Sequence, residues 1–286
     1  MMNTGTLASL DIQGESRIPS LHGRLALAAR RAVQSPWGIS SLTCAVLLLL
    51  WSAITATGLI APLFLPSPLA VVRKLGELAS AGFVGATLWQ HLGASLARVG
   101  LALLAALAVA IPVGLAMGLH PRVRAVLDPL IEFYRPIPPL AYLPLVVIWF
   151  GIDELSKVLL IWLAIFAPVV IATVSGVART DESRLRAAQS FGATRWQLVR
   201  HIVLPSALPD ILTGVRVGLG VGWSTLVAAE LVAAQRGLGF MIQSAAQFLN
   251  TEIVVAGILV IAAVAFALEF GLRRLQRRWV PWQGRG

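Results

Sequence analysis

The sequence is poor in charge and nearly free of cysteine. Charged residues make up only 13% of its 286 residues, about half the share that is usual in soluble domains. The single cysteine, Cys44, excludes a disulfide framework within the chain and a zinc site built on cysteines. Hydrophobic residues make up 57%, and the few charges are gathered in clusters between long apolar runs. This layout argues against an ordinary cytosolic enzyme and is typical of a polytopic membrane protein.

Motifs for nucleotide binding and catalysis are also missing from the sequence. No G-x-x-x-x-G-K-S/T phosphate loop occurs, which excludes ATP binding in the usual way. The four histidines are scattered without metal-ligand spacing, and Ser, His and Asp residues form no catalytic constellation. We therefore expect no catalytic residue, no metal site and no cofactor.

Six apolar stretches are long enough to cross a bilayer, whose hydrocarbon core of about 30 Å needs roughly 20 helical residues. They cover residues 41–60, 99–119, 136–152, 158–178, 211–234 and 253–272. The third is the shortest, and prolines at 136, 138, 139 and 144 break it. A broken helix is tolerated in a membrane only where it is buried or lines a cavity. The sequence therefore predicts an all-α membrane protein of about six transmembrane helices, the third beside an internal path.

Lysine and arginine are distributed asymmetrically over the segments between these stretches. If the N-terminus lies inside, sixteen of the 23 fall on inside segments and four on outside segments; the others, Arg98, Arg135 and Arg216, lie at or within spans. Because cytoplasmic segments carry the excess of basic residues, both termini are predicted to be cytoplasmic. The same bias explains most of the net charge of +10 without nucleic acid as a partner.

The predicted organisation is a cytoplasmic N-terminal tail over residues 1–40, a six-helix membrane domain over 41–272 and a basic cytoplasmic tail over 273–286. A cleaved signal peptide is the alternative for the first apolar run. Such peptides begin near residue 1 and have a shorter apolar core, so a first membrane span fits the sequence better.

The inside loop over residues 179–210 has a helical pattern of its own. Residues 180–182, Thr-Asp-Glu, place acids at a helix start, where the helix dipole favours them. Leu185, Ala188 and Phe191 follow as an apolar stripe at helical spacing. Gly192 predicts the stop, because glycine adopts the left-handed cap conformation without penalty.

A second short helix is predicted directly after this glycine. Thr194 and Gln197 have the spacing of a capping box. Its apolar face consists of Trp196, Val199 and Ile202. Pro205 and Pro209 are expected to end it and to angle the chain into the next span. The two helices could anchor the loop on the membrane interface or form a docking site for a partner.

One string in this loop resembles the EAA motif of ABC-importer permeases, written E-A-A-x3-G-x9-I-x-L-P. The matching residues are Ala187, Ala188, Gly192, Ile202, Leu204 and Pro205, and every spacing agrees. The first position departs from the family, since Arg186 stands where the motif has Glu. Whatever that Glu contributes at the contact with the ATPase must be altered or absent here.

Longer stretches extend the resemblance over residues 41–282, to the permeases of the sulfonate/nitrate/taurine branch. They are residues 86–91, 127–136, 148–151, 218–231 and 236–241. The resemblance implies a type I importer permease fold in the bacterial inner membrane. It also implies three partners: a cytoplasmic ABC ATPase dimer seated on the coupling helix 187–191, an extracytoplasmic substrate-binding protein and a second, identical permease subunit. Within the branch, the similarity to taurine importers implies taurine or a related small sulfonate as cargo, which is moved without covalent change.

Three other functions stay open beside this one. The same machine could carry another solute, such as an alkanesulfonate, nitrate or a pyrimidine precursor. A secondary transporter driven by an ion gradient usually has inverted repeats, and none is found in this sequence. A membrane-embedded enzyme would need polar groups clustered at one depth on facing helices, whereas the sequence offers isolated ones.

Ionisable residues inside predicted spans mark pathways or structural pairs. Glu230, together with Trp223, Ser224 and Thr225, is the candidate for the translocation path, and a structural salt bridge of Glu230 is the favoured alternative. Arg98 and Glu269 are expected at the two membrane interfaces, and Arg216 is expected to reach the cytoplasmic interface by snorkelling. Asp128, Glu132 and Arg135 have the spacing of one ion cluster on a helix face. Four glycines of the fifth span predict close helix packing: Gly214, Gly218, Gly220 and Gly222.

Overall fold

The computed structural model describes residues 36–281, and the chain divides into two compact units, residues 1–59 and 60–286. The first unit contains α2 (Pro36–Ala56), which carries no charged residue. Its residues Gly38–Ala56 have a mean hydropathy of 2.0, so α2 is apolar and long enough to cross a membrane. The predicted first span over residues 41–60 therefore begins and ends a few residues earlier in the structure.

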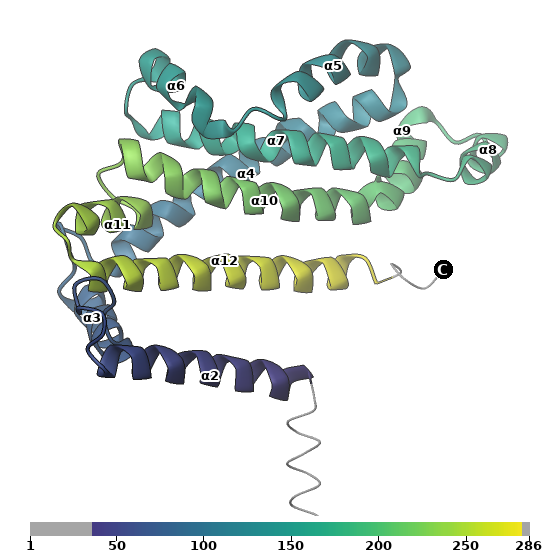
Figure 1. Ribbon diagram of the computed structural model, residues 1–286. Helices are drawn as coiled ribbons and strands as arrows, with labels where there is room; N and C mark the ends of the chain where they lie inside the picture. The colour runs from purple at the N-terminus through teal and green to yellow at the C-terminus, as the bar shows by residue number, and fades with distance from the viewer. Residues whose placement is uncertain (1–35, 282–286) are drawn as a thin grey trace, which may run out of the picture. The chain divides into compact units, whose positions relative to one another are not determined.

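The second unit is built from helices, and no strand occurs within residues 60–281. Its elements in chain order are α3 (Pro68–Ser80), α4 (Leu88–Leu119), α5 (Pro121–Tyr134), η1 (Pro139–Tyr142), α6 (Leu143–Phe150), α7 (Glu154–Ala178), α8 (Glu182–Ser190), α9 (Arg195–Leu198), η2 (Val199–Val203), α10 (Leu204–Ala233), α11 (Leu238–Gln247) and α12 (Thr251–Trp279). Figure 1 shows α7, α10 and α12 running side by side along the unit.

The core of this unit lies along α7, which packs between α4 and α10. Small residues allow these helices to approach closely. A Cβ atom added at Gly114 of α4 would lie 2.5 Å from the Cβ of Thr173, and one at Gly176 would lie 2.9 Å from the Cβ of Ala207. Membrane helices associate through such close packing of small residues, because the bilayer provides no hydrophobic driving force between them.

Among the described residues, five helices are long and apolar enough to span a membrane. They are α2, α4, α7, the continuous helix that includes α10, and α12. A sixth span results if α5 and the η1–α6 segment, which are bent by 88° at their break, are one span. The predicted break in the third span is confirmed at residues 135–138, where Pro136 and Pro138 prevent α5 from continuing.

The prediction that Pro205 and Pro209 end a helix is wrong. Arg195–Val232 forms one helical span, in which Pro205 lies in the first turn of α10 and Pro209 lies inside it. The five-residue π turn η2 precedes Pro205, and the N–H of Leu204 donates to the carbonyl of Val199. A proline at the start of a helical segment costs little, because its missing N–H is not needed there.

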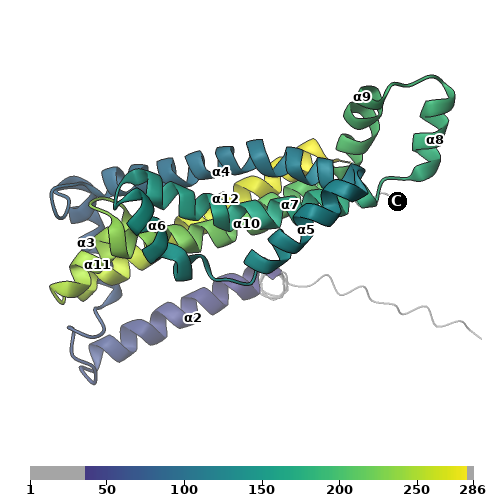
Figure 2. The ribbon, with the colours of Figure 1, turned by 90° about the horizontal axis from the view of Figure 1, so that it is seen from above.

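The segments that carry the inside excess of basic residues share one end of the second unit. Figures 1 and 2 both show α8 and α9 projecting at the end where α4 meets α5 and where α12 finishes. The helices α3 and α11 lie at the opposite end. The predicted N-terminal tail lies almost wholly outside the described residues.

Candidate functional site: a projecting helical loop, a buried ion network and a cavity

The projecting loop over residues 179–210 contains the first predicted short helix, α8. The carboxylate of Asp181 caps it by accepting a hydrogen bond of 2.8 Å from the backbone N–H of Ser183. Hydrogen bonding from Ser183, by its side chain and then its backbone, lowers the pKa of Asp181 and keeps it ionised at the positive end of the helix dipole. Gly192 has a φ of +82°, in the left-handed region that favours glycine. The predicted start and glycine stop of this helix are therefore confirmed.

The second short helix, α9, begins at the predicted capping box. The Thr194 side chain accepts a hydrogen bond of 3.3 Å from the N–H of Gln197, and the Gln197 side chain accepts one of 2.8 Å from the N–H of Thr194. The side chains that this helix and η2 bury are Leu198 and Val203. They lie five residues apart, which matches the wider π turn, and Trp196, two residues before Leu198, points away from the packed face.

Two large apolar side chains project from the loop without a partner in the described chain. Phe191 is 92% exposed and Trp196 is 69% exposed, on either side of Gly192. No residue of α8 is buried. Exposed apolar side chains next to a rigid turn mark an interaction surface for another protein or for a membrane.

The residues of the EAA-like string fall on both halves of the loop. Arg186 and Ala187 are exposed on α8, whereas Ala188, Ile202, Leu204 and Pro205 are half-buried. The Nη2 atom of Arg186 lies 2.5 Å from the Oε2 atom of Glu182, one turn earlier on the same exposed face. Arg186 thus has an acid neighbour within its own helix.

A salt bridge closes the base of the loop. The Nη1 atom of Arg179, at the end of α7, lies 2.9 Å from the Oδ1 atom of Asp210 in α10. These are the first and last residues of the predicted loop, but the sequence pattern gave no sign that they pair. The bridge fixes the distance between the two helices from which the loop projects.

Glu230 lies in a buried ion network at the opposite end of the unit. Its side chain is fully buried, and its Oε1 atom accepts hydrogen bonds from Ser95 at 2.8 Å and from Arg98 at 2.6 Å. Its Oε2 atom accepts a bond of 2.9 Å from the N–H of Gly239. The structural salt bridge that the sequence offered as the alternative for Glu230 is present.

The expected position of Arg98 near the membrane interface stays a prediction, but within the protein its side chain is only 6% exposed. Its Nε and Nη2 atoms donate to Glu154 at 2.5 and 2.8 Å, and Nη1 also donates to the carbonyl of Arg236 at 2.7 Å. The carboxylates of Glu154 and Glu230 lie far away in sequence, which explains why hydropathy alone did not reveal the pairing. The network ties α4 to the start of α7 and to the junction of α10 and α11.

The chain between α10 and α11 passes so close to this ion network that it requires a glycine there. Gly237 has a φ of +137°, and a Cβ at this position would collide with the carboxylate of Glu230. The N–H of Gly237 donates to the Nδ1 atom of His91 at 3.2 Å, while the Nε2 atom of His91 lies 3.2 Å from the carbonyl of Phe83. Ser95 and His91, which sequence reasoning did not single out, therefore hold this junction to α4.

The other predicted path residues point to different sides of α10. Trp223 and Thr225 are buried within the bundle, whereas Ser224 is exposed. Ser224 donates a hydrogen bond of 3.2 Å to the carbonyl of Gly220, one turn earlier. The structure does not bring the four residues to one surface, since only Ser224 faces outward.

The remaining charges predicted within spans form pairs at the surface. Arg216 lies 3.0 Å from Glu269, so it has an acid partner in α12 as well as any interfacial contact. Glu269 also pairs with Arg273 at 2.7 Å. The cluster expected on the helix face of α5 is divided into two pairs, Arg124 with Asp128 at 3.6 Å and Glu132 with Arg135 at 3.8 Å.

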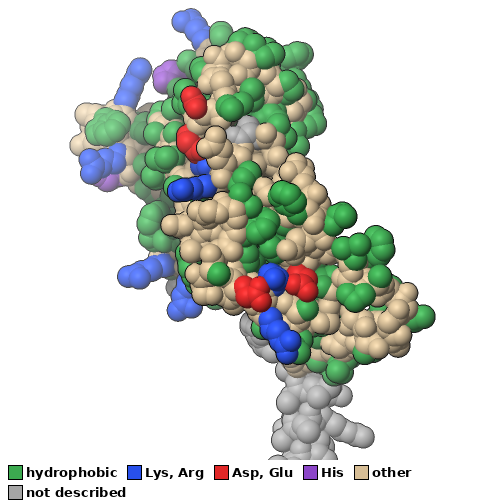
Figure 3. Space-filling model, turned by 90° about the vertical axis from the view of Figure 1, so that its left-hand side faces the viewer, with side chains coloured by type: hydrophobic (Ala, Val, Ile, Leu, Met, Phe, Trp, Pro, Cys, Tyr) green, Lys and Arg blue, Asp and Glu red, His purple; other side chains and the backbone are tan. Residues whose placement is uncertain are grey.

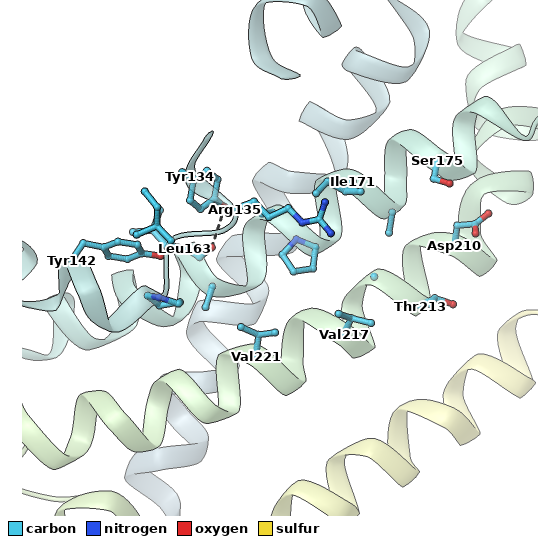
Figure 4. Close-up of a pocket in the computed structure, with 17 residues that line it drawn as sticks. Tyr134, Arg135, Tyr142, Leu163, Ile171, Ser175, Asp210, Thr213, Val217 and Val221 are labelled. Carbon is cyan, nitrogen blue, oxygen red and sulfur yellow. Dashed lines mark hydrogen bonds between the residues drawn. The ribbon is translucent and has the colours of Figure 1, made fainter. Parts of the chain in front are cut away.

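A cavity of about 520 Å³ opens beside the broken span. Its wall is formed by the end of α5, by η1, by the middle of α7 and by one face of α10 (Figure 4). In Figure 4, Arg135 and Tyr142 point into the space in front of α7, and Asp210 and Thr213 border it from α10. Tyr134 donates a hydrogen bond of 3.1 Å to the carbonyl of Leu163 and so joins α5 to α7. The broken span therefore borders a cavity, and its place beside the translocation path stays a prediction.

On the face that Figure 3 shows, many hydrophobic side chains are exposed and the charged side chains form small separate groups. Such a surface, with several long apolar helices, a helical loop at one end and a cavity along a broken span, defines a polytopic membrane protein of the transporter kind. Residues 106–281 match the family of the binding-protein-dependent transport system inner membrane component. The chain belongs to this family and is a multi-pass permease component of an ABC-type importer.

Curated relatives agree with this assignment. The chain is 63% identical over 243 residues to the taurine transport system permease protein TauC of Escherichia coli K12, covering 85% of this chain and 88% of that protein. It is 36% identical over 247 residues to SsuC of Bacillus subtilis 168, which is named for the transport of aliphatic sulfonates, covering 86% and 88%.

A solved structure supports the fold at greater distance. An inward-facing structure of the MetNI methionine ABC transporter matches with a TM-score of 0.61 and 17% sequence identity, covering 67% of this chain and 95% of that chain. At this identity the likeness concerns the fold alone, which is that of an ABC importer permease.

Proposed function

We propose that this protein is the permease subunit of an ATP-driven importer for taurine or a related small sulfonate. The observation that carries the proposal is the 63% identity to a taurine permease over most of both chains. The chain has no phosphate loop of its own. The energy therefore comes from a separate ATPase, and the protein moves its cargo without chemical change.

The projecting loop is the element that docks on the cytoplasmic ATPase dimer. Phe191 and Trp196 offer apolar side chains that a groove on the ATPase can bury, and Gly192 turns the chain between them. Ala187 and Ala188 have small side chains on α8 at the contact, while Ile202, Leu204 and Pro205 lie half-buried where the loop continues into α10. Interface cores gain much of their stability from such buried aromatic anchors.

Arg186 replaces the family Glu within this surface, and Glu182 is its neighbour. We assign it to a complementary acid on the ATPase, since a charge reversal on one partner calls for the opposite charge on the other. An Arg186→Glu variant that couples better with the native ATPase would contradict this assignment.

The loop end of the protein is assigned to the cytoplasm, with both termini there, the N-terminal tail over residues 1–40 and the basic tail over 273–286 included. The excess of lysine and arginine on these segments supports this orientation. The opposite end, with α3 and α11, then receives substrate from an extracytoplasmic binding protein. Two identical permease subunits complete one pore in the inner membrane.

The translocation path follows the outward face of α10. Ser224 lies on this face, and Trp223, Thr225 and Glu230 support it from the buried side. Because Glu230 holds Arg98, Ser95 and Gly239 together, it is assigned to keeping the extracytoplasmic end of the path in shape.

The second candidate function is the same machine with another anion, such as an alkanesulfonate or nitrate. The 36% identity to SsuC favours a sulfonate in that case. Uptake of labelled taurine in cells that lack their own importer separates the two candidates, with the permease, the ATPase and the binding protein encoded beside it expressed together. Taurine uptake that alkanesulfonates and nitrate compete for only weakly supports taurine, whereas stronger competition by another anion replaces it.

A further inference from the structure

One guanidinium group lines the cavity beside the broken span, and its ion pairing with the protein is weak enough to let it bind a solute. Arg135 lines the cavity, its side chain is 57% exposed, and its acid neighbour Glu132 lies 3.8 Å away on the exposed surface. Ion pairs between exposed side chains at such distances contribute little to stability. By contrast, the acid that lines the same cavity, Asp210, is held by Arg179 at 2.9 Å.

The position of Arg135 is dictated by the broken span. It follows the last residue of α5, and the prolines after it prevent the helix from continuing. The arginine therefore sits at the 88° bend between α5 and the η1–α6 segment rather than on a straight helix. Ionisable side chains at such breaks are costly and mark pathways for charged solutes.

The remaining wall suits a small zwitterion. Tyr142 adds a hydroxyl and an aromatic ring to the lining of the same cavity, and the parts of the wall that come from α7 and α10 are mainly apolar (Figure 4). A guanidinium has a planar fork of donors that matches an oxyanion. Aromatic rings attract the ammonium group at the other end of an aminosulfonate.

We infer that this cavity is a binding site for the cargo within the permease, where Arg135 binds the sulfonate group. The inference rests on the proposed function as a sulfonate importer and adds a specificity-determining residue to it. The binding protein then selects the solute first, and Arg135 admits to the membrane path only cargo that carries an oxyanion group such as a sulfonate. Sequence reasoning placed the broken third span beside an internal path but assigned Arg135 to an ion cluster and named Glu230 as the candidate path residue.

The test uses the complete importer, with the permease, its ATPase and its binding protein in proteoliposomes. Labelled taurine uptake and the ATP hydrolysis that loaded binding protein stimulates are measured together. Loss of a charged hydrogen-bonded contact to cargo is expected to lower uptake by about tenfold or more in Arg135→Gln. Stimulated ATP hydrolysis is expected to stay within about twofold of wild type, because docking and coupling are intact.

Two further variants separate recognition from folding. Arg135→Lys keeps the charge but loses the fork, so its uptake is expected to lie between wild type and Arg135→Gln. Arg122→Gln changes an exposed arginine at the other end of α5, outside the residues that line the cavity, and is expected to behave as wild type.

The possible outcomes point to different parts of the account. Normal uptake by Arg135→Gln, or a parallel fall of uptake and stimulated ATP hydrolysis, overturns the proposal that Arg135 binds the sulfonate group in this cavity. Import of no sulfonate at all by the wild-type complex contradicts the proposed function itself.

Discussion

Arg179 and Asp210 form a salt bridge of 2.9 Å that joins the end of α7 to α10 at the base of the projecting loop. Asp210 also lines the cavity. Since Arg195–Val232 is one continuous helical span, the second half of the projecting loop and one wall of the cavity belong to the same helix. A movement of the loop by the ATPase would therefore shift that wall directly, as in the rigid-body transitions that couple distant sites.

Removing this bridge is expected to impair coupling more than stability. In Asp210→Asn, taurine uptake should fall several-fold, because the loop loses its fixed base. The melting temperature should hardly change, since a partly exposed pair contributes about 1 kcal/mol or less. The charge-swapped double variant Arg179→Asp, Asp210→Arg is the control and should recover uptake. Equal uptake in the wild type and Asp210→Asn would show that the bridge has no part in coupling.

Two substitutions at Gly192 should separate the effect of an added charge from the effect of the backbone conformation. No atom lies within 4 Å of a Cβ added there, so its φ of +82° is the local constraint. Asn tolerates this region, so Gly192→Asn should keep uptake and ATPase co-purification. Gly192→Asp has nearly the same shape but adds a charge at the docking surface and should lose both. If Gly192→Asp retains uptake and co-purification, this loop is not the docking element.

The buried network predicts unequal effects of two carboxylate substitutions. Glu230→Gln leaves a buried guanidinium with one acid and should destabilise the protein by about 3 kcal/mol. Glu154 is 63% exposed, so water replaces part of the lost interaction and Glu154→Gln should cost clearly less than Glu230→Gln. Thermal unfolding of the detergent-solubilised permease measures both. A Glu230→Gln variant with wild-type stability but no uptake would assign Glu230 to the path rather than to the scaffold.

The sequence predicted local features that depend on a few neighbouring residues. The glycine stop at Gly192 and the capping box of Thr194 and Gln197 need no distant partner, and both are present. The Arg98–Glu230 pair joins residues 132 positions apart, so neither hydropathy nor spacing could reveal it. Similarly, the sequence predicts a helix stop at Pro209 because proline ends an isolated helix. In the structure α10 continues past Pro209, since its packing on α7 stabilises the helix.

The glycines of α10 are expected to differ in their tolerance to substitution. A Cβ at Gly214 would collide with the Cβ of Ala172 in α7, whereas one at Gly220 meets nothing within 4 Å. Gly214→Ala should therefore destabilise the protein by about 1–3 kcal/mol through overpacking. Gly220→Ala should leave stability unchanged or raise it slightly, because alanine favours the helix. Equal melting temperatures for the two variants would contradict the close approach of α7 and α10.

The central claim is that this permease imports a sulfonate with energy from a separate ATPase. The most direct measurement is labelled taurine uptake into proteoliposomes that contain the permease alone or with its ATPase, with binding protein and with either ATP or an ion gradient. The account predicts uptake only when permease, ATPase, binding protein and ATP are all present. Uptake by the permease alone, driven by an ion gradient, would contradict it.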